Sequence, residues 1–225
     1  MRASRRGRAR RGDVVWARNL DRLQLAVVLE PDVERVRARE MLFVAMVALG
    51  DSLGALAPPE VAITWSWPCT VHVNRARLGA MELAIAPDED ENGAPAWMAV
   101  GMDLPIRPDP KGPEPGFSMD RTTLYDEGCV ELDRTMLIES YCRHLLTWIH
   151  TWSEEGFRPV HEAWMFRANG RGESIGVVYE GAEVTGRFLG LDDHGNMLLN
   201  ADGGTTLLHV ETALGASSGL AEAKE

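Results

Sequence analysis

The order of apolar and polar positions predicts two strands and a long helix at the start of the chain. Residues 14–16 and 25–29 are short apolar runs, and the second has the continuous apolar character of a central strand. From Asp32 to about Gly54, apolar residues recur at three- and four-residue steps, which predicts a helix with Asp32 as its N-cap. Three arginines near its start are expected on its solvated side: Arg35, Arg37 and Arg39.

The stretch from residue 61 to residue 85 predicts three strands, connected by a Trp-Pro corner and a tight turn. Apolar residues at mostly alternating positions mark the strands: Val61, Ile63 and Trp65, then Val71 and Val73, then Leu78, Met81, Leu83 and Ile85. Pro68 has no N–H to give to a ladder, so it should end the first strand or lie at an edge. Asn74 and Arg75 mark the turn, and Gly79 leaves room in the return strand for a close approach of backbone or ligand.

The middle of the chain predicts one further strand between two loops. Residues 87–96 are acidic and contain glycine and proline, which is typical of a surface loop. Residues 97–106 alternate again and predict a strand. Residues 107–119 contain four prolines and two glycines, so we expect a mobile loop there that could act as a lid.

The second half predicts two helices and a small β-barrel. The first helix should begin after Asp133 as N-cap and stop at Gly156, and a short one should cover residues 160–167. The polar segment 167–172, twice interrupted by glycine, is the predicted domain boundary. Short strands separated by turn residues follow at 175–179, 183–191, 197–200 and 205–210. The small and polar residues 213–225 predict a disordered tail.

The composition allows a sizeable core, and the charge restricts the choice of partners. With 225 residues, 45% of them apolar, the chain can form one large domain or a large and a small one. A net charge of −11 argues against broad binding to nucleic acids or membrane surfaces. The first 22 residues nevertheless hold eight basic residues and two aspartates, a charge of +6, which leaves −17 for the rest. Such an arginine run is typical of a disordered basic tail.

Cysteine use and hydropathy predict a cytoplasmic protein. Cys69, Cys129 and Cys142 are an odd number without paired spacing, which favours free thiols in a reducing compartment. No apolar run reaches the length of a membrane span, and residues 1–11 lack the apolar core of a signal peptide. We therefore expect neither DNA nor a membrane as a partner.

The Trp67-Pro68 corner and its hairpin resemble the biotin and lipoate protein ligase family. The biotin branch of that family has a Lys-Trp-Pro-Asn-Asp strand end, a short hairpin, and a Lys-(small)-Ala-Gly-Ile return strand. Residues 78–81 here follow the corner at the family's distance. The departures are Ser66 for the first lysine, Cys69 and Thr70 for the Asn-Asp pair, and Arg77 for the reactive-site lysine. Only two lysines occur in the chain, Lys111 and Lys224.

Three later segments extend the resemblance in the family's order. Residues 100–105 lie in the slot of a Gly-x-(Gly/Asp)-hydrophobic-Asn strand, with Pro105 in place of the asparagine. Residues 155–159 match Glu-Gly-(Leu/Phe)-x-Pro, and residues 186–199 match a Gly-x-x-x-Gly-(hydrophobic)-Asp-x-x-Gly-x-Leu-(Leu) strand pair. The resemblance implies an α+β fold, a mixed sheet with helices on one side, followed by a small SH3-like barrel. It implies a ligase-like domain over 1–168, without the family's first strand and helix, a barrel over 172–212, and the tail.

The resemblance also implies a set of site residues. Residues 7–13 resemble the family's Gly-Arg-Gly-Arg-Arg-Gly-Arg-x-Trp loop, with Trp16 one residue late, although an arginine-rich start can also be incidental. In the first case three arginines would clamp phosphates: Arg8, Arg10 and Arg11. Arg77 would be the catalytic cation that holds the carboxylate or α-phosphate, and Trp67 and Gly79 would wall the acid pocket. Alternatively, Trp67 is a core aromatic, Gly79 relieves crowding, and Arg77 is a surface residue.

The implied activity is the condensation of biotin or lipoate with ATP, accompanied by Mg²⁺, and transfer of the acyl group to a lysine of a carrier-protein domain. A second hypothesis is a catalytically degenerate relative that binds an acyl group or a carrier domain. A third is an interaction module centred on the barrel. The six histidines show no metal-ligand spacing, so no metal site is expected from them. The sequence does not indicate the oligomeric state.

Overall fold

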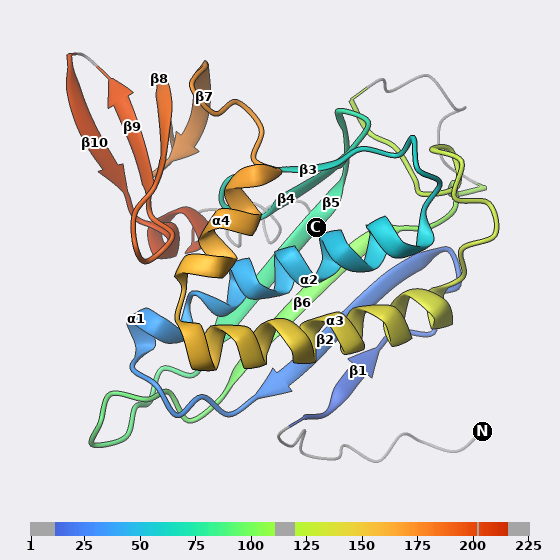
Figure 1. Ribbon diagram of the computed structural model, residues 1–225, viewed down its shortest axis with the longest axis horizontal. Helices are drawn as coiled ribbons and strands as arrows, with labels where there is room; N and C mark the ends of the chain where they lie inside the picture. The colour runs from blue at the N-terminus through green and yellow to red at the C-terminus, as the bar shows by residue number, and fades with distance from the viewer. Residues whose placement is uncertain (1–11, 111–119, 202, 216–225) are drawn as a thin grey trace.

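A computed structural model describes residues 12–110, 120–201 and 203–215 of the chain. Of the predicted lid segment 107–119, residues 107–110 are described and residues 111–119 lie outside the described part. Two sheets and a layer of helices make up the fold (Figure 1).

The larger sheet contains six strands in the order β1-β2-β6-β5-β4-β3. They are β1 (Val14–Trp16), β2 (Arg22–Leu29), β3 (Ile63–Ser66), β4 (Thr70–Val73), β5 (Ala76–Ile85) and β6 (Met98–Pro105). The α+β class is confirmed, but the five ladders of this expected mixed sheet are all antiparallel. Among the described residues, parallel pairing is limited to isolated bridges at Trp65–Ala168 and Arg77–Arg121. The predicted turn is confirmed, since Asn74 and Arg75 both have positive φ.

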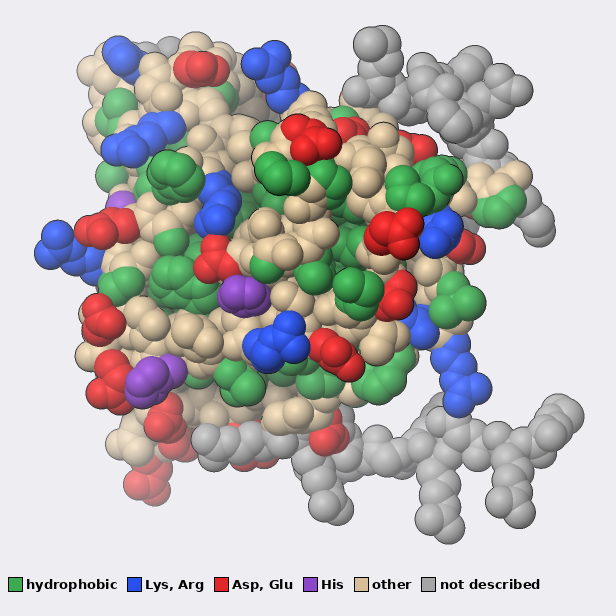
Figure 2. Space-filling view, turned by 45° about the vertical axis from the view of Figure 1, so that its right-hand side comes forward, with side chains coloured by type: hydrophobic (Ala, Val, Ile, Leu, Met, Phe, Trp, Pro, Cys, Tyr) green, Lys and Arg blue, Asp and Glu red, His purple; other side chains and the backbone are tan. Residues whose placement is uncertain are grey.

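Four helices cover one face of this sheet: α1 (Arg35–Ala38), α2 (Met41–Leu56), α3 (Arg134–Glu155) and α4 (Arg158–Phe166). Helices α2 and α3 run side by side across the sheet (Figure 1), and residues 41–50 of α2 are all buried. Its apolar character on every side is typical of a helix enclosed in a core. On the face shown in Figure 2, acidic and basic side chains are interspersed among apolar ones.

The start of the first long helix differs from the prediction. Asp32 is not its N-cap, because the helix begins at Arg35, and Glu34 precedes it without a side-chain capping bond. Instead, the N–H of Arg35 donates to the carbonyl of Gly93, 3.0 Å away in the acidic loop. Arg39 and Glu40 form a turn that keeps helical backbone angles, and this turn divides the predicted helix into α1 and α2.

The three arginines of this region are not merely solvated, as had been expected from the sequence. Arg35 pairs with Glu89, Arg37 lies 5.1 Å from the Trp152 ring centre, and Arg39 pairs with Glu211. These contacts connect the region of α1 to the acidic loop, to α3 and to the helical residues 210–215.

The two predicted boundaries of the second long helix are confirmed. The Asp133 carboxylate accepts from the N–H of Met136 at 2.9 Å, as an N-cap does. Gly156 ends α3 with a φ of +79°, which a residue with a side chain rarely adopts. Helix α4 begins two residues earlier than expected, at Arg158, because Pro159 fits the first turn of a helix.

The second sheet holds β7 (Ser174–Tyr179), β8 (Ala182–Leu191), β9 (Met197–Ala201) and β10 (Gly204–Leu208), antiparallel in the order β10-β9-β8-β7. It stands beside the end of the larger sheet (Figure 1). The predicted disordered tail begins with ordered residues, because 210–215 are helical and Ala213 is buried. The remaining tail residues, 216–225, lie outside the described part.

The segment between the two sheets is bonded to the edge strand β3. The N–H of Trp65 donates to the carbonyl of Arg167, and the N–H of Asn169 donates to the carbonyl of Trp65. The Trp65 indole donates to the carbonyl of Trp164 at 2.8 Å and stacks on the Trp164 ring. The connection between the sheets is therefore a packed extension of the larger sheet.

Candidate functional site

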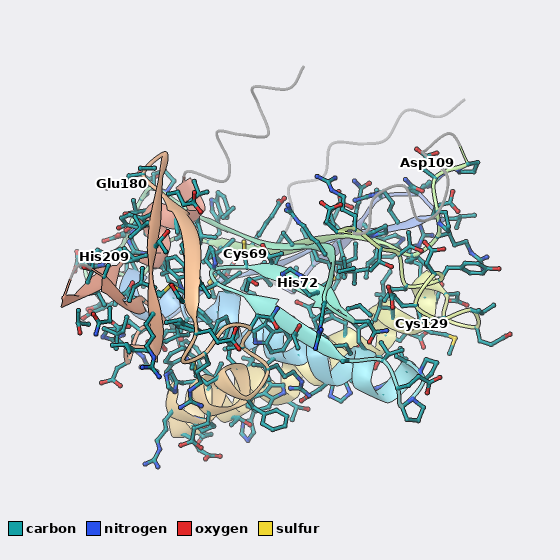
Figure 3. The ribbon with its side chains drawn as sticks, turned by 90° about the horizontal axis from the view of Figure 1, so that it is seen from above. Cys69, His72, Asp109, Cys129, Glu180 and His209 are labelled. Atoms are coloured by element: carbon teal, nitrogen blue, oxygen red, sulfur yellow. The ribbon has the colours of Figure 1, made fainter. Side chains whose placement is uncertain are left out.

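The helices cover one face of the six-stranded sheet, so alternate side chains of each strand point to the opposite, open face (Figure 3). Small residues lie near the middle of this open face: Ala26 pairs with Gly101, and Ala80 lies opposite Asp103. The other partner of Gly101 is Glu82 of β5, whose side chain is exposed. Larger polar side chains lie at two places around them, one on β2 and β6 and one on β3, β4 and β5. The open face therefore has small residues and the exposed Glu82 between two polar groups.

Asp103 is the centre of the first polar group. Its carboxylate accepts from Arg22 Nε at 2.8 Å and from Gln24 Nε2 at 3.2 Å. Asp103 and Arg22 side chains each keep 40% of their surface exposed, so this ion pair adds little to stability. The carboxylate oxygens are thus engaged by donors of β2, which leaves them poorly suited to a metal ion.

Arg77 and His72 form the second polar group. They are cross-strand partners on β5 and β4, with Arg77 exposed and His72 half-buried. His72 Nε2 lies 3.1 Å from the hydroxyl of Ser66 on β3. Burial lowers the pKa of His72 below its ordinary value, and the charge of Arg77 acts in the same direction. A neutral imidazole thus lies beside a permanent cation.

Cys69 lies at the start of the same hairpin and is buried. Burial raises the pKa of its thiol to about 11, against a smaller opposite effect of Arg77. The three cysteines are free thiols, as expected. The raised pKa keeps Cys69 protonated near neutral pH, so it offers no thiolate to a substrate.

The structure places Trp67 between the two sheets. Its side chain is buried, and its indole N–H donates to the carbonyl of Gly195 at 2.9 Å. The Trp67-Pro68 bond is cis. This placement supports the core-aromatic interpretation of Trp67 more than a pocket wall.

Gly79 is packed against the neighbouring strand. A Cβ added there would collide with the carbonyl oxygen of Asp103 and lie 2.8 Å from Leu104 Cδ2. Strand β6 therefore leaves no room for a side chain at this position, which supports the interpretation that Gly79 relieves crowding between strands. Ala80 follows it and shares the open face with Asp103.

The predicted phosphate clamp, Arg8, Arg10 and Arg11, lies outside the described residues. Within the described ranges, no group of three or more His, Cys, Asp and Glu side chains could hold a metal ion. Among the helices of the same ranges, none combines the length and apolar character needed to cross a membrane.

Sequence reasoning missed several residues of the open face. His72 was considered only as a metal ligand, and Arg22 and Gln24 were not considered. Their alternation with buried residues was the available signal, because it places them on the same face. The pairing of β2 with β6, which brings Arg22 to Asp103, joins residues 81 positions apart.

Comparison with known proteins agrees with this fold. A model of the biotin/lipoate A/B protein ligase family matches residues 1–166, and one of the biotin protein ligase C-terminal domain matches residues 172–212. A biotin–[acetyl-CoA-carboxylase] ligase from Paracoccus denitrificans is 28% identical over 206 residues, 90% of this chain and 83% of that protein.

Solved structures add two relatives. A biotin protein ligase-like protein of unknown function from Silicibacter sp. is 38% identical, with a TM-score of 0.78 over 89% of this chain and 84% of the other. The biotin protein ligase from Aquifex aeolicus has a TM-score of 0.75 over 90% and 87% of the two chains, at 17% identity, and shares the fold. The same ligase is known in complex with biotin and ATP. The resemblance seen in the sequence is thus confirmed, and the chain belongs to the biotin/lipoate A/B protein ligase family.

Proposed function

We propose that this protein activates biotin, or lipoate, with ATP and transfers the acyl group to a lysine of a carrier-protein domain. The acid's carboxylate would attack the α-phosphate, and pyrophosphate would leave. The lysine amine would then attack the acyl carbon, form an amide and release AMP. The observation that carries the proposal is an exposed cation, Arg77, at the family's lysine position on the open face of the sheet.

Arg77 supplies the charge that the first step needs. A guanidinium stays protonated at any physiological pH and can hold two oxygens of a carboxylate or phosphate at once. Fixed donors of this kind stabilise the negative charge that grows on the α-phosphate. The guanidinium differs from an ammonium in shape, so the bound acid or nucleotide would lie differently from the lysine-containing relatives.

The names of the relatives support biotin as the acid and ATP as the co-substrate. Lipoate rests on the family description alone. Mg²⁺ would enter bound to ATP, because the described residues offer no cluster of metal ligands. The carrier would be a biotin-carrier domain, as the name of the Paracoccus relative suggests. We propose a cytoplasmic location, where ATP and carrier domains are available.

One set of observations favours the degenerate relative instead. Trp67 and Gly79 serve packing in this structure, and the Asn-Asp pair of the family is replaced by a buried thiol, Cys69, and Thr70. Such a protein would bind an acyl group or a carrier domain without forming the adenylate.

Release of pyrophosphate tests the proposal. The purified full-length protein is incubated with Mg²⁺-ATP and biotin, lipoate or octanoate, with and without a carrier domain. We expect release with one of these acids, and a loss of about 100-fold in Arg77→Ala, the usual cost of removing one such donor. Arg77→Lys should retain more activity than Arg77→Ala.

Arg158→Ala is the matched control, because the side chain of this arginine is 87% exposed and forms an i,i+4 pair with Glu162 on the surface of α4. Its release rate should equal that of the unchanged protein. No release with any acid from folded protein would contradict the ligase proposal. Calorimetric titration with the same acids and carrier would then test the degenerate relative, which should still bind an acid or the carrier domain.

A further inference from the structure

The turn between β8 and β9 is held in shape by its own hydrogen bonds, and it extends from the second sheet to the first domain. Its Asp192 carboxylate accepts from the N–H of His194 and of Asn196, both at 2.9 Å, and from the Asn196 amide at 2.8 Å. Gly195 completes the turn with a φ of +82°. These local bonds fix the shape of the turn.

The turn docks into the first domain through two consecutive residues. Gly195 accepts the buried hydrogen bond from the Trp67 indole, and it packs so closely on Phe43 that an added Cβ would collide with the ring. His194 Nδ1 lies 3.0 Å from Glu40 Oε1, and the Glu40 side chain is only 3% exposed. The second oxygen of Glu40 accepts from the Trp152 indole at 2.7 Å. Helices α2 and α3 and the Trp-Pro corner thus meet at this one turn.

Trp67 connects this contact to the candidate site. It lies in the three-residue connection between β3, which ends at Ser66, and β4, which begins at Thr70. His72 is only two residues further along β4, between Ser66 and Arg77. A shift of the Trp67 indole would therefore move the strand that carries His72 beside Arg77.

We propose that the β8–β9 turn is a positioning element for the candidate site, which acts through Trp67 on the hairpin that carries His72 and Arg77. Gly195 and His194 are its positioning residues, and neither needs to touch a substrate. The kinetic consequence rests on the proposed ligase function, whereas the placement of His72 does not. The second sheet then serves the chemistry of the first domain rather than forming a separate module.

The substitution Gly195→Ala tests this with an unusually close control. Gly195 and Gly203 have the same φ of +82°, but a Cβ at Gly203 would meet nothing within 4 Å. Both substitutions place a side chain at the same unfavourable φ, and only Gly195→Ala brings a Cβ against Phe43. Adding Phe43→Leu to Gly195→Ala removes ring atoms from the collision and should restore the docking.

Imidazole NMR gives a readout that requires no activity. In the unchanged protein and in Gly203→Ala, His72 should titrate below its ordinary pKa, and in Gly195→Ala its pKa should move back toward the ordinary value. The kcat/KM of pyrophosphate release should fall at least about tenfold in Gly195→Ala and recover in the double variant. If Gly195→Ala does not fold, Trp67→Phe, which removes the indole N–H together with part of the buried ring, should shift the His72 titration in the same direction.

An unchanged His72 titration in folded Gly195→Ala, or equal effects of Gly195→Ala and Gly203→Ala, would overturn the proposal. A wild-type protein without pyrophosphate release would end the ligase proposal alone. The His72 titration would still decide the role of the turn.

Discussion

On the helix-covered face of the six-stranded sheet, Trp65, Val71 and Leu104 have no exposed surface. Their neighbours in sequence on the open face, Ser66, His72 and Asp103, keep part of their surface in water and bond to other polar side chains. The same strands thus carry two kinds of residue at a period of two. The helix-covered face is stabilised by close packing, so removing buried side-chain volume there costs much free energy of unfolding. On the open face, ion pairs and hydrogen bonds orient the side chains but contribute little to that free energy.

The largest difference in stability between the two faces is expected at Trp65. Trp65→Ala removes a fully buried ring that stacks on Trp164 and donates to its carbonyl, so we expect a loss of about 3–5 kcal/mol in the free energy of unfolding. Thr64→Ala, one residue earlier on the open face, should cost below about 1 kcal/mol. Urea unfolding measures both. Similar losses would show that the two faces do not differ in this way.

On β6, substitutions at two adjacent residues should show a smaller difference in the free energy of unfolding. Leu104→Ala should cost about 2–5 kcal/mol, since this side chain is fully buried. Asp103→Asn breaks the pair with Arg22, which is 40% exposed, and should cost below about 1 kcal/mol. Unfolding midpoints under identical conditions compare them. A larger loss in Asp103→Asn would mean that the open face contributes to stability through its charges.

The smallest effect concerns the titration of His72. Because its pKa is lowered in the folded protein, the unfolded chain takes up the proton first as the pH falls. The free energy of unfolding should therefore decrease as the pH falls through 6.5, and this contribution should level off below the folded pKa. His72→Gln lacks the titrating group, so subtracting its pH profile isolates the contribution. A difference that grows in the opposite direction would contradict the lowered pKa.

The sequence pattern predicted the turns and helix ends correctly where residues adjacent in the chain determine them. Asn74-Arg75 formed the predicted turn, and Asp133 and Gly156 bounded α3 as expected, since turns and caps depend on a few adjacent residues. The N-cap at Asp32 was wrong for a physical reason. A backbone carbonyl from a distant loop, that of Gly93, accepts the bond from the first N–H of α1, and no local pattern reveals such a partner.

The candidate site was predicted only in part. The position of Arg77 followed from a short motif, and the structure places it on the open face beside His72. The sequence also marked Gly79 and Trp67, but what surrounds them is set by Asp103 on β6 and by Gly195 in the β8–β9 turn. Both partners lie far along the chain from the hairpin, so the local sequence of the hairpin does not reveal them.

By itself, the sequence determined which residues alternate, where strands turn and helices stop, and to which family the chain belongs, because these depend on neighbours along the chain. Only the tertiary structure decided that Asp103 is engaged by Arg22, that His72 lies beside Arg77, and that Trp67 is bound by the β8–β9 turn. Each of these contacts joins different strands or sheets. Their existence depends on how the layers pack, which short-range patterns do not encode.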